Sequence, residues 1–171
     1  MKEAFEEVVK GKAFEYSVIS TSDISFSPEL IKACEANACG RYNKYWNCPP
    51  ATESFEKLKE RITAFPFAFV FSTKADLEDS FDYEGMVAAK DYHTDITAEL
   101  HERFGKTNSV FGPGGCKTCQ ACAYPDPCRF PGKVYFSLSA AGINVTELSR
   151  AGGIRYNNGV NTTTYFSMIL F

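Results

Sequence analysis

Apolar residues recur at helical spacing in some segments of the chain and alternate with their neighbours in others, which predicts a mixture of helices and strands. A short helix is expected over residues 1–12 and a strand over Phe14–Ser20. Phenylalanine then occupies every second position from Phe65 to Phe71, and the residues between are mostly apolar as well. We therefore expect both faces of this strand to be covered by other elements.

Further segments extend the same pattern. Three begin with a helix start signal, namely Ser27–Gly40, the stretch from Thr52 to Ile62 and Asn144–Gly152. Helical spacing of apolar residues predicts the longest helix over Tyr83–Phe104. Two more predict strands, namely Asn108–Phe111 and Thr162–Phe171. Because helices and strands roughly alternate, we expect an α/β fold, with α+β as the alternative, in which flanking helices cover a single compact sheet. No repeat or low-complexity linker divides the chain, so residues 1–171 should form one domain.

The composition excludes several classes of protein. With 171 residues the chain can bury about 70% of its unfolded surface, so it does not need disulfides to stay folded. A net charge of −3 argues against a nucleic-acid partner. No apolar run approaches the roughly 20 residues of a membrane helix, and the acidic first segment lacks the apolar core of a signal peptide. We therefore expect a cytoplasmic protein, in which thiols stay reduced.

Seven cysteines carry the candidate chemistry. The first group has the spacing C-x4-C-x8-C and comprises Cys34, Cys39 and Cys48. The second group has the spacing C-x2-C-x2-C-x5-C and comprises Cys116, Cys119, Cys122 and Cys128. Only Cys34 is predicted to lie inside a helix, and the others fall in loops or at helix ends. In a reducing compartment such clusters indicate metal binding or catalysis rather than disulfides.

The spacing of the second group favours an iron–sulfur cluster. Three cysteines, each two residues apart, can turn their sulfurs toward one centre only if the loop wraps around that centre. Ferredoxins use the run C-x2-C-x2-C-x3-C-P in this way, although here the last spacing is five and proline follows only at Pro131. Zinc is the main alternative, but structural zinc sites usually take two close pairs separated by a long spacer. We expect [4Fe–4S] clusters, one or two per chain.

The first group is weaker evidence, because a widely spaced trio is not specific by itself. It forms either a second site or part of the first one, and Cys48, which is followed directly by Pro49, is the candidate for crossing between the two groups. Seven thiolates cannot complete two four-cysteine sites. One iron would therefore be ligated by another residue or stay open for a small molecule.

Other residues near the cysteines have more ordinary explanations. Five cations lie close to them in the sequence and could stabilise a negatively charged cluster, namely Arg41, Lys44, Lys117, Arg129 and Lys133. Trp46, the only tryptophan, could shield a cluster from water or simply pack on the core. His93 and His101 lie eight residues apart on the longest predicted helix. We expect both to be exposed to solvent, with completion of the first cysteine group as the alternative.

These motifs resemble those of the family called predicted metal-binding protein, domain of unknown function 2284. The similar segments, from about Cys34 to the end of the chain, are Cys39-Gly-Arg-Tyr, Trp46-Asn-Cys48-Pro-Pro, the run from Cys116 to Pro131, and Gly142-Ile-Asn-Val. The resemblance implies cysteine-bound metal, with iron–sulfur clusters the usual inference, in a family found largely in anaerobic bacteria and archaea. Asn144 stands where an aspartate is common in the family, which does not touch the proposed ligands.

Three functions are compatible with the sequence. The first is electron transfer in anaerobic metabolism through clusters bound to the seven cysteines, with a redox partner protein. The second is an enzyme or accessory subunit that uses an open iron site to bind a small ligand. The third is a zinc-stabilised interaction module. We rank electron transfer first, and whether the protein is an enzyme stays open.

Overall fold

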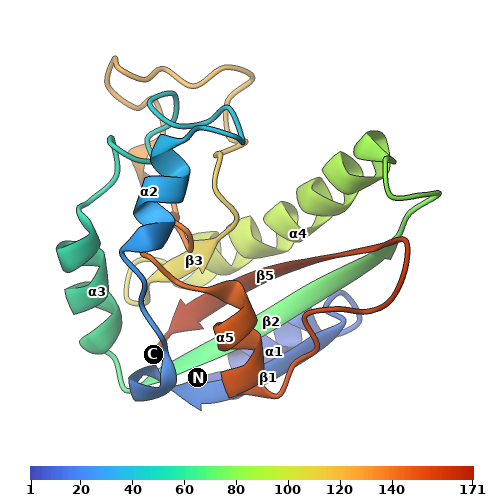
Figure 1. Ribbon diagram of the computed structural model, residues 1–171. Coiled ribbons are helices and arrows are strands. Elements are labelled where there is room, and N and C mark those ends of the chain that lie inside the picture. The colour runs from blue at the N-terminus through green and yellow to red at the C-terminus, as the bar shows by residue number, and fades with distance from the viewer.

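A five-stranded sheet with helices on both of its faces forms the body of the protein (Figure 1). The computed structural model describes residues 1–171. The strands lie in the order β1 (Glu15–Ser20), β2 (Phe67–Asp76), β5 (Thr162–Leu170), β3 (Val110–Gly112) and β4 (Phe136–Ser137). Neighbouring strands are antiparallel except for β3 and β4, which are parallel. This mixed sheet with flanking helices confirms the predicted fold class.

Five α-helices surround the sheet, and they are α1 (Lys2–Val9), α2 (Glu29–Glu35), α3 (Phe55–Thr63), α4 (Tyr83–Phe104) and α5 (Val145–Gly152). A short 3-10 helix, Thr21–Asp23, follows β1, and another, Pro131–Lys133, precedes β4. Asn144 caps α5, because its side-chain oxygen accepts hydrogen bonds from the N–H groups of Thr146 and Glu147. This helix and the longest one, α4, begin and end where the sequence predicts.

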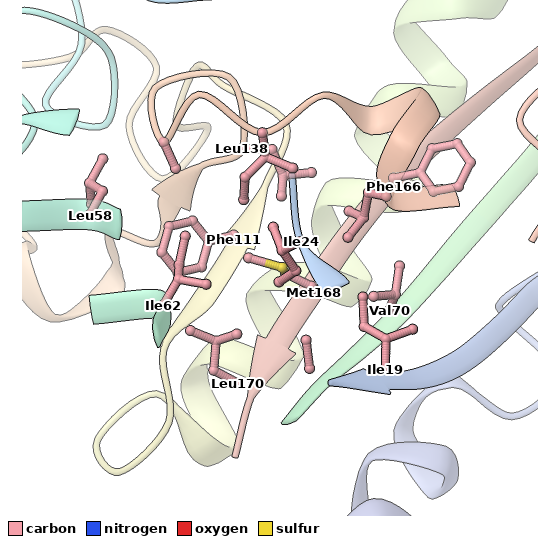
Figure 2. Close-up of a cluster of buried hydrophobic side chains, with 14 of the residues drawn as sticks. Ile19, Ile24, Leu58, Ile62, Val70, Phe111, Leu138, Phe166, Met168 and Leu170 are labelled. Carbon is pink, nitrogen blue, oxygen red and sulfur yellow. The ribbon is translucent and has the colours of Figure 1, made fainter. Parts of the chain in front are cut away.

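The central strand β2 is apolar on both faces because a hydrophobic core lies on each side of it. Phe69 and Phe71 pack with residues of α1 and α4, whereas Ala68 and Val70 pack with residues of α3 and α5. Figure 2 shows the second of these cores, which gathers side chains from the sheet, from α3 and from the segment before α5. The alternating phenylalanines thus predicted correctly a strand that is covered on both faces.

The C-terminal strand β5 lies inside the sheet rather than at its edge. It pairs with β2 along nine residues, from Thr162 to Leu170, and with β3 on its other side. Its last five residues are buried. A strand at the end of a chain is ordered when ladder bonds hold it on both sides, as they do here.

Some predicted boundaries are wrong. The α3 helix is capped by Ser54, whose Oγ accepts a hydrogen bond from the N–H of Lys57, and not by Thr52. The α2 helix ends at Glu35, before the predicted stop at Gly40, and none of its residues is buried. A helix without a buried face gains little from packing, which accounts for its short length.

The prediction that His93 is exposed is also wrong. His93 is fully buried between α4 and the sheet, where Nδ1 lies 2.9 Å from Thr73 Oγ1 and Nε2 lies 2.8 Å from Ser167 Oγ. Its neighbours Thr94 and Thr97 are buried as well. Hydrophobic periodicity cannot identify the α4 face that carries His93, because that face is polar. Hydroxyl groups on the facing strands bond to the ring and offset the cost of burying it.

Candidate metal centre

Six of the seven cysteines lie on two loops that run side by side at one end of the sheet, whereas Cys34 lies inside α2, as predicted (Figure 1). The first cysteine loop, residues 36–50, follows α2. The second cysteine loop, residues 113–130, follows β3. Neither loop contains a helix or a strand, as the prolines and glycines in them predict. The fold therefore brings together two segments that are far apart in the sequence.

Polar contacts and one aromatic contact join the two loops. The Trp46 indole donates a hydrogen bond of 3.1 Å to the carbonyl of Asp126, and its ring lies 5.2 Å from that of Tyr124 in an edge-on arrangement. The Tyr124 hydroxyl donates to Asn43 Oδ1 at 2.8 Å. Asn43 has a positive φ of 57°, a conformation that asparagine tolerates better than most residues.

A second set of contacts lies directly at the cysteines. The N–H of Cys116 donates to Asn47 Oδ1 at 3.1 Å, so the residue before Cys48 holds the first cysteine of the second group. Arg41 Nη1 donates to the carbonyl of Gly114 at 2.6 Å. Gly115 has a φ of 83°, a conformation that residues with a side chain rarely adopt, and a Cβ there would displace the Arg41 side chain from its present position. A glycine is therefore required for this close approach of the two loops.

The α4 helix fixes the start of the second loop. Lys90 Nζ donates a hydrogen bond of 2.7 Å to the carbonyl of Gly114, and Asp91 forms an ion pair of 2.7 Å with Lys117. Of the other cations near the cysteines, Arg129 donates to the carbonyl of Ala121 at 3.1 Å. These cations thus hold the loops in place in addition to contributing positive charge.

The four cysteines of the second group line one small pocket. Its wall consists mainly of apolar side chains, namely Trp46, Ala123, Phe130 and Val134, together with Cys116, Cys119, Cys122 and Cys128. The cavity measures about 20 Å³, which is enough for a single water. Four thiols around one apolar cavity form a donor set for a thiophilic metal. Of the two alternatives expected for Trp46, the tryptophan adopts the one in which it covers the cysteines.

The three cysteines of the first group also neighbour one another, but their environments differ. Cys48 is buried, Cys34 is half-buried and Cys39 is exposed. Burial raises the pKa of Cys48 to about 11, and the nearby Cys39 and Cys34 add to this, while the Gly115 N–H and Arg41 oppose it. Burial, followed by Cys39, also raises the pKa of Cys34. Both thiols must therefore lose a proton when they bind a metal.

All seven cysteines are free thiols. No three cysteine, histidine or acidic side chains converge closely enough to hold a metal ion as they stand. The loops have no regular ladder to resist a small rearrangement. The four thiols around one pocket can therefore be drawn together by a metal.

Two buried polar groups beside the cysteines have no hydrogen-bond partner. One is Asn47 Nδ2, whose residue is 1% exposed, and the other is the hydroxyl of Tyr135, which is 3% exposed. A buried donor without a partner costs about 1–3 kcal/mol. Both donors fit an arrangement in which they bond to metal-bound sulfurs, which are acceptors.

The surroundings of Tyr135 place its hydroxyl close to both cysteine groups. Burial raises the pKa of Tyr135 to about 12, and Cys116 and Cys48 are near enough to add to that rise. The neighbouring Thr94 hydroxyl opposes the rise, but the geometry between the two groups falls short of a hydrogen bond, and Thr94 Oγ1 is itself without a partner. The tyrosine hydroxyl is therefore available to a group on the cysteine side.

The histidines do not complete either group. His93 is bonded to Thr73 and Ser167, away from the loops. His101 Nε2 donates a hydrogen bond of 3.1 Å to the carbonyl of Gly132, in the segment that connects the second loop to β4. This nitrogen is therefore engaged there and does not join the thiols as a metal ligand.

Three residues of the site were missed by the sequence pattern, namely Asn47, Tyr135 and Lys90. Tyr135 and Lys90 lie in segments without a cysteine motif, so the sequence pattern does not link them to the site. Only Asn47, which stands between Trp46 and Cys48, belongs to a segment that the cysteine motif could have singled out.

Comparison with known proteins agrees with this geometry. Residues 17–171 match the family described as "Predicted metal-binding protein (DUF2284)". No curated protein and no solved structure gives a significant match. None of the helices has the length and apolar character that a membrane span requires. The matched region includes both cysteine loops and all of the sheet except the start of β1. The resemblance seen in the cysteine motifs is thereby confirmed, and the chain belongs to the DUF2284 family of predicted metal-binding proteins.

Proposed function

We propose that this protein binds iron–sulfur clusters through its seven cysteines and serves electron transfer in anaerobic metabolism. The observation that carries this proposal is the single apolar pocket lined by all four cysteines of the second group. An iron–sulfur cluster supplies one-electron transfer, and the protein sets its potential through burial, charge and hydrogen bonds to sulfur. Residues of this chain would provide the burial, the charge and the hydrogen bonds.

The second group would hold the first cluster, and the side chains around it would keep water away. Trp46 and Phe130 form apolar walls of the pocket, which lowers the local dielectric constant around bound thiolates. Arg41, Lys90 and Lys117 bring positive charge to the start of the loop. Positive charge stabilises the more negative, reduced state of a cluster and so raises its potential.

Asn47 and Tyr135 would act between the two cysteine groups. Asn47 Oδ1 already accepts from the N–H of Cys116, and its Nδ2 is a free buried donor beside Cys48. The Tyr135 hydroxyl is the second free donor near both thiols. Hydrogen bonds from these donors to metal-bound sulfurs would remove the cost of their burial and would also raise the potential.

The first group would hold a second metal through three thiolates, with Cys39 at the surface. Because Cys39 lies at the surface, this metal would be within reach of a redox partner protein in the cytoplasm. The same trio supports a second candidate, in which the open fourth position on that metal binds a small ligand and the protein is an enzyme or accessory subunit. A third candidate, a zinc-stabilised interaction module, is favoured by the small volume of the pocket that the second cysteine group lines.

One experiment separates these functions. The protein is purified without oxygen, iron, sulfide and zinc are counted per chain, and electron paramagnetic resonance is recorded before and after reduction. We expect iron and sulfide in cluster stoichiometry and a signal that changes on reduction. Stoichiometric zinc without sulfide would reject both iron functions. A signal that shifts on addition of cyanide would favour the open-site candidate over a closed electron carrier.

The Cys119→Ser variant tests the ligand assignment. Loss of one thiolate from the second group should remove most of the metal bound there and the visible absorbance that goes with it. The matched control is Ser139→Ala, which changes an exposed residue outside both cysteine loops. Unchanged metal content and absorbance in Cys119→Ser would show that the pocket is not the site.

A further inference from the structure

A large open cavity lies beside the pocket of the second cysteine group. It measures about 980 Å³, at the upper end of the range for small-molecule sites. Its wall is formed by the last turns of α4, by Arg61 of α3, by the start of β3 and by the segment from Pro131 to Phe136 that leads back from the second cysteine loop. The cavity is therefore built from the rigid body of the protein and from the end of the second loop together.

The cavity and the cysteine pocket share part of their walls. Thr118 and Val134 line both of them. Thr118 directly precedes Cys119 in the loop, and its hydroxyl lies 3.3 Å from the sulfur of Cys116. A molecule in the cavity would thus be separated from the thiols by one layer of side chains.

The charges around the cavity favour an anion. Three cations line it, Arg61, Lys106 and Lys133, against one acid, Glu102. Arg61 is held in place, because it pairs with Glu53 at 2.6 Å and its guanidinium lies 4.7 Å from the centre of the Phe136 ring. In a chain with a net charge of −3, this is a local excess of positive charge.

The two lysines differ from Arg61 because neither forms an ion pair within the protein. Lys106 follows the end of α4, and Lys133 lies in the 3-10 helix that leads back to the sheet. This 3-10 helix is fixed to α4, since His101 donates a hydrogen bond to the carbonyl of Gly132. Both lysine side chains therefore start from anchored backbone at the cavity, and both ammonium groups are free to meet a ligand.

We propose that this cavity binds a small anionic molecule, with a carboxylate or phosphate group held by Lys106 and Lys133 and its apolar part against Val134 and Phe136. The position of the ligand beside a metal rests on the proposed function, whereas the anion site itself does not. Carboxylate and phosphate share the same chemistry toward an ammonium group, because each presents charged oxygens that accept its hydrogen bonds.

Isothermal titration calorimetry of the protein purified without oxygen, at low ionic strength, tests the proposal, with inorganic phosphate in one arm and succinate in the other. We expect at least one of the two anions to bind. The double variant Lys106→Gln/Lys133→Gln should weaken that binding by about tenfold or more, because both free charges are lost. The matched control, Lys2→Gln/Lys10→Gln, removes the same charge from the exposed α1 segment and should leave binding unchanged.

The anion whose titration gives a heat of binding, phosphate or succinate, shows whether the site takes phosphates or carboxylates. No binding of either anion at about 10 mM, or equal binding by the lysine double variant and the wild type, would overturn the proposal. Metal content is measured on the same samples. Anion binding by a protein that holds no metal would leave this site standing and reject the proposed function, whereas metal without anion binding would do the reverse.

Discussion

The sheet with its helices and the pair of cysteine loops are stabilised by different means. Forty-two residues of the chain are buried, and only three of them belong to the cysteine loops, namely Asn47, Cys48 and Gly115. The body is held by two apolar cores and by strand ladders, whereas the loops are held by individual hydrogen bonds, one ion pair and one aromatic contact. The body can therefore fold by burying its own side chains, but the loops lack the core that would hold their thiols together.

This difference shows where a metal would matter. In the body, the buried His93 has a hydrogen-bond partner at each ring nitrogen. Beside the cysteines, Asn47 Nδ2 and the Tyr135 hydroxyl have none. Bound metal would hold the loops together, as the apolar cores hold the body together. A change in one region should consequently leave the other region intact.

Removal of the metal should have the largest effect, and it should be confined to the loops. After treatment with a strong chelator, we expect amide protons in residues 36–50 and 113–130 to exchange rapidly, because no core or ladder protects them. Protection of β2 and β5 should persist. Hydrogen exchange followed by mass spectrometry measures both regions in one sample. If the strands lost protection together with the loops, the body would not be an independent unit.

A substitution in the body should have the opposite pattern. Phe69→Ala removes a fully buried ring that packs on Phe5 at 5.7 Å between ring centres. We expect the free energy of unfolding to fall by about 3–5 kcal/mol. Metal bound per folded chain should not change, because Phe69 belongs to the core shared with α1 and α4. Denaturant titration and metal analysis measure the two quantities.

The control for this variant is Phe81→Ala, which truncates a ring that is 91% exposed. Its free energy of unfolding should stay within about 0.5 kcal/mol of the wild type. A loss of metal from folded Phe69→Ala would show that the body and the loops are coupled and would contradict the division between them.

The same division explains what the sequence could predict. Alternating phenylalanines identified β2, because apolar burial on both faces determines that strand. Helical spacing identified α4 with its correct ends, although polar residues make up most of its buried face. The spacing of the second cysteine group identified four residues that do line one pocket. Hydrophobic patterns therefore predicted the central part of the fold, and cysteine spacing singled out four residues that the fold brings to one pocket.

The remainder depends on contacts between distant residues, which no local pattern contains. His93 is buried because Thr73 and Ser167 lie opposite it on two strands. The cap of α3 was misplaced because Thr52 and Ser54 are both good capping residues, and only the path of the chain from the first loop decides between them. The contact of Asn47 with Cys116 likewise joins two loops that the sequence keeps far apart.

The last prediction concerns His93, a buried titratable residue of the body whose effect appears only as the pH falls. Burial lowers the pKa of His93 to about 3 from an ordinary value of 6.5. Between these two pH values the unfolded chain binds a proton that the folded chain does not. Stability from this residue is therefore fully present above pH 6.5 and is lost as the pH falls toward 3, by about 1.4 kcal/mol per pH unit.

The His93→Gln variant tests this sign, because glutamine can still bond to a strand hydroxyl but does not titrate. We expect a less stable protein whose free energy of unfolding depends less steeply on pH, between about 6.5 and about 4.5, than that of the wild type. Chemical denaturation of the metal-free protein at several pH values measures both slopes without interference from thiolate protonation at a metal. In the control, His101→Gln, the slope should change less, because that ring is only half-buried. Parallel slopes for wild type and His93→Gln would mean that His93 is not held neutral by burial in the folded protein.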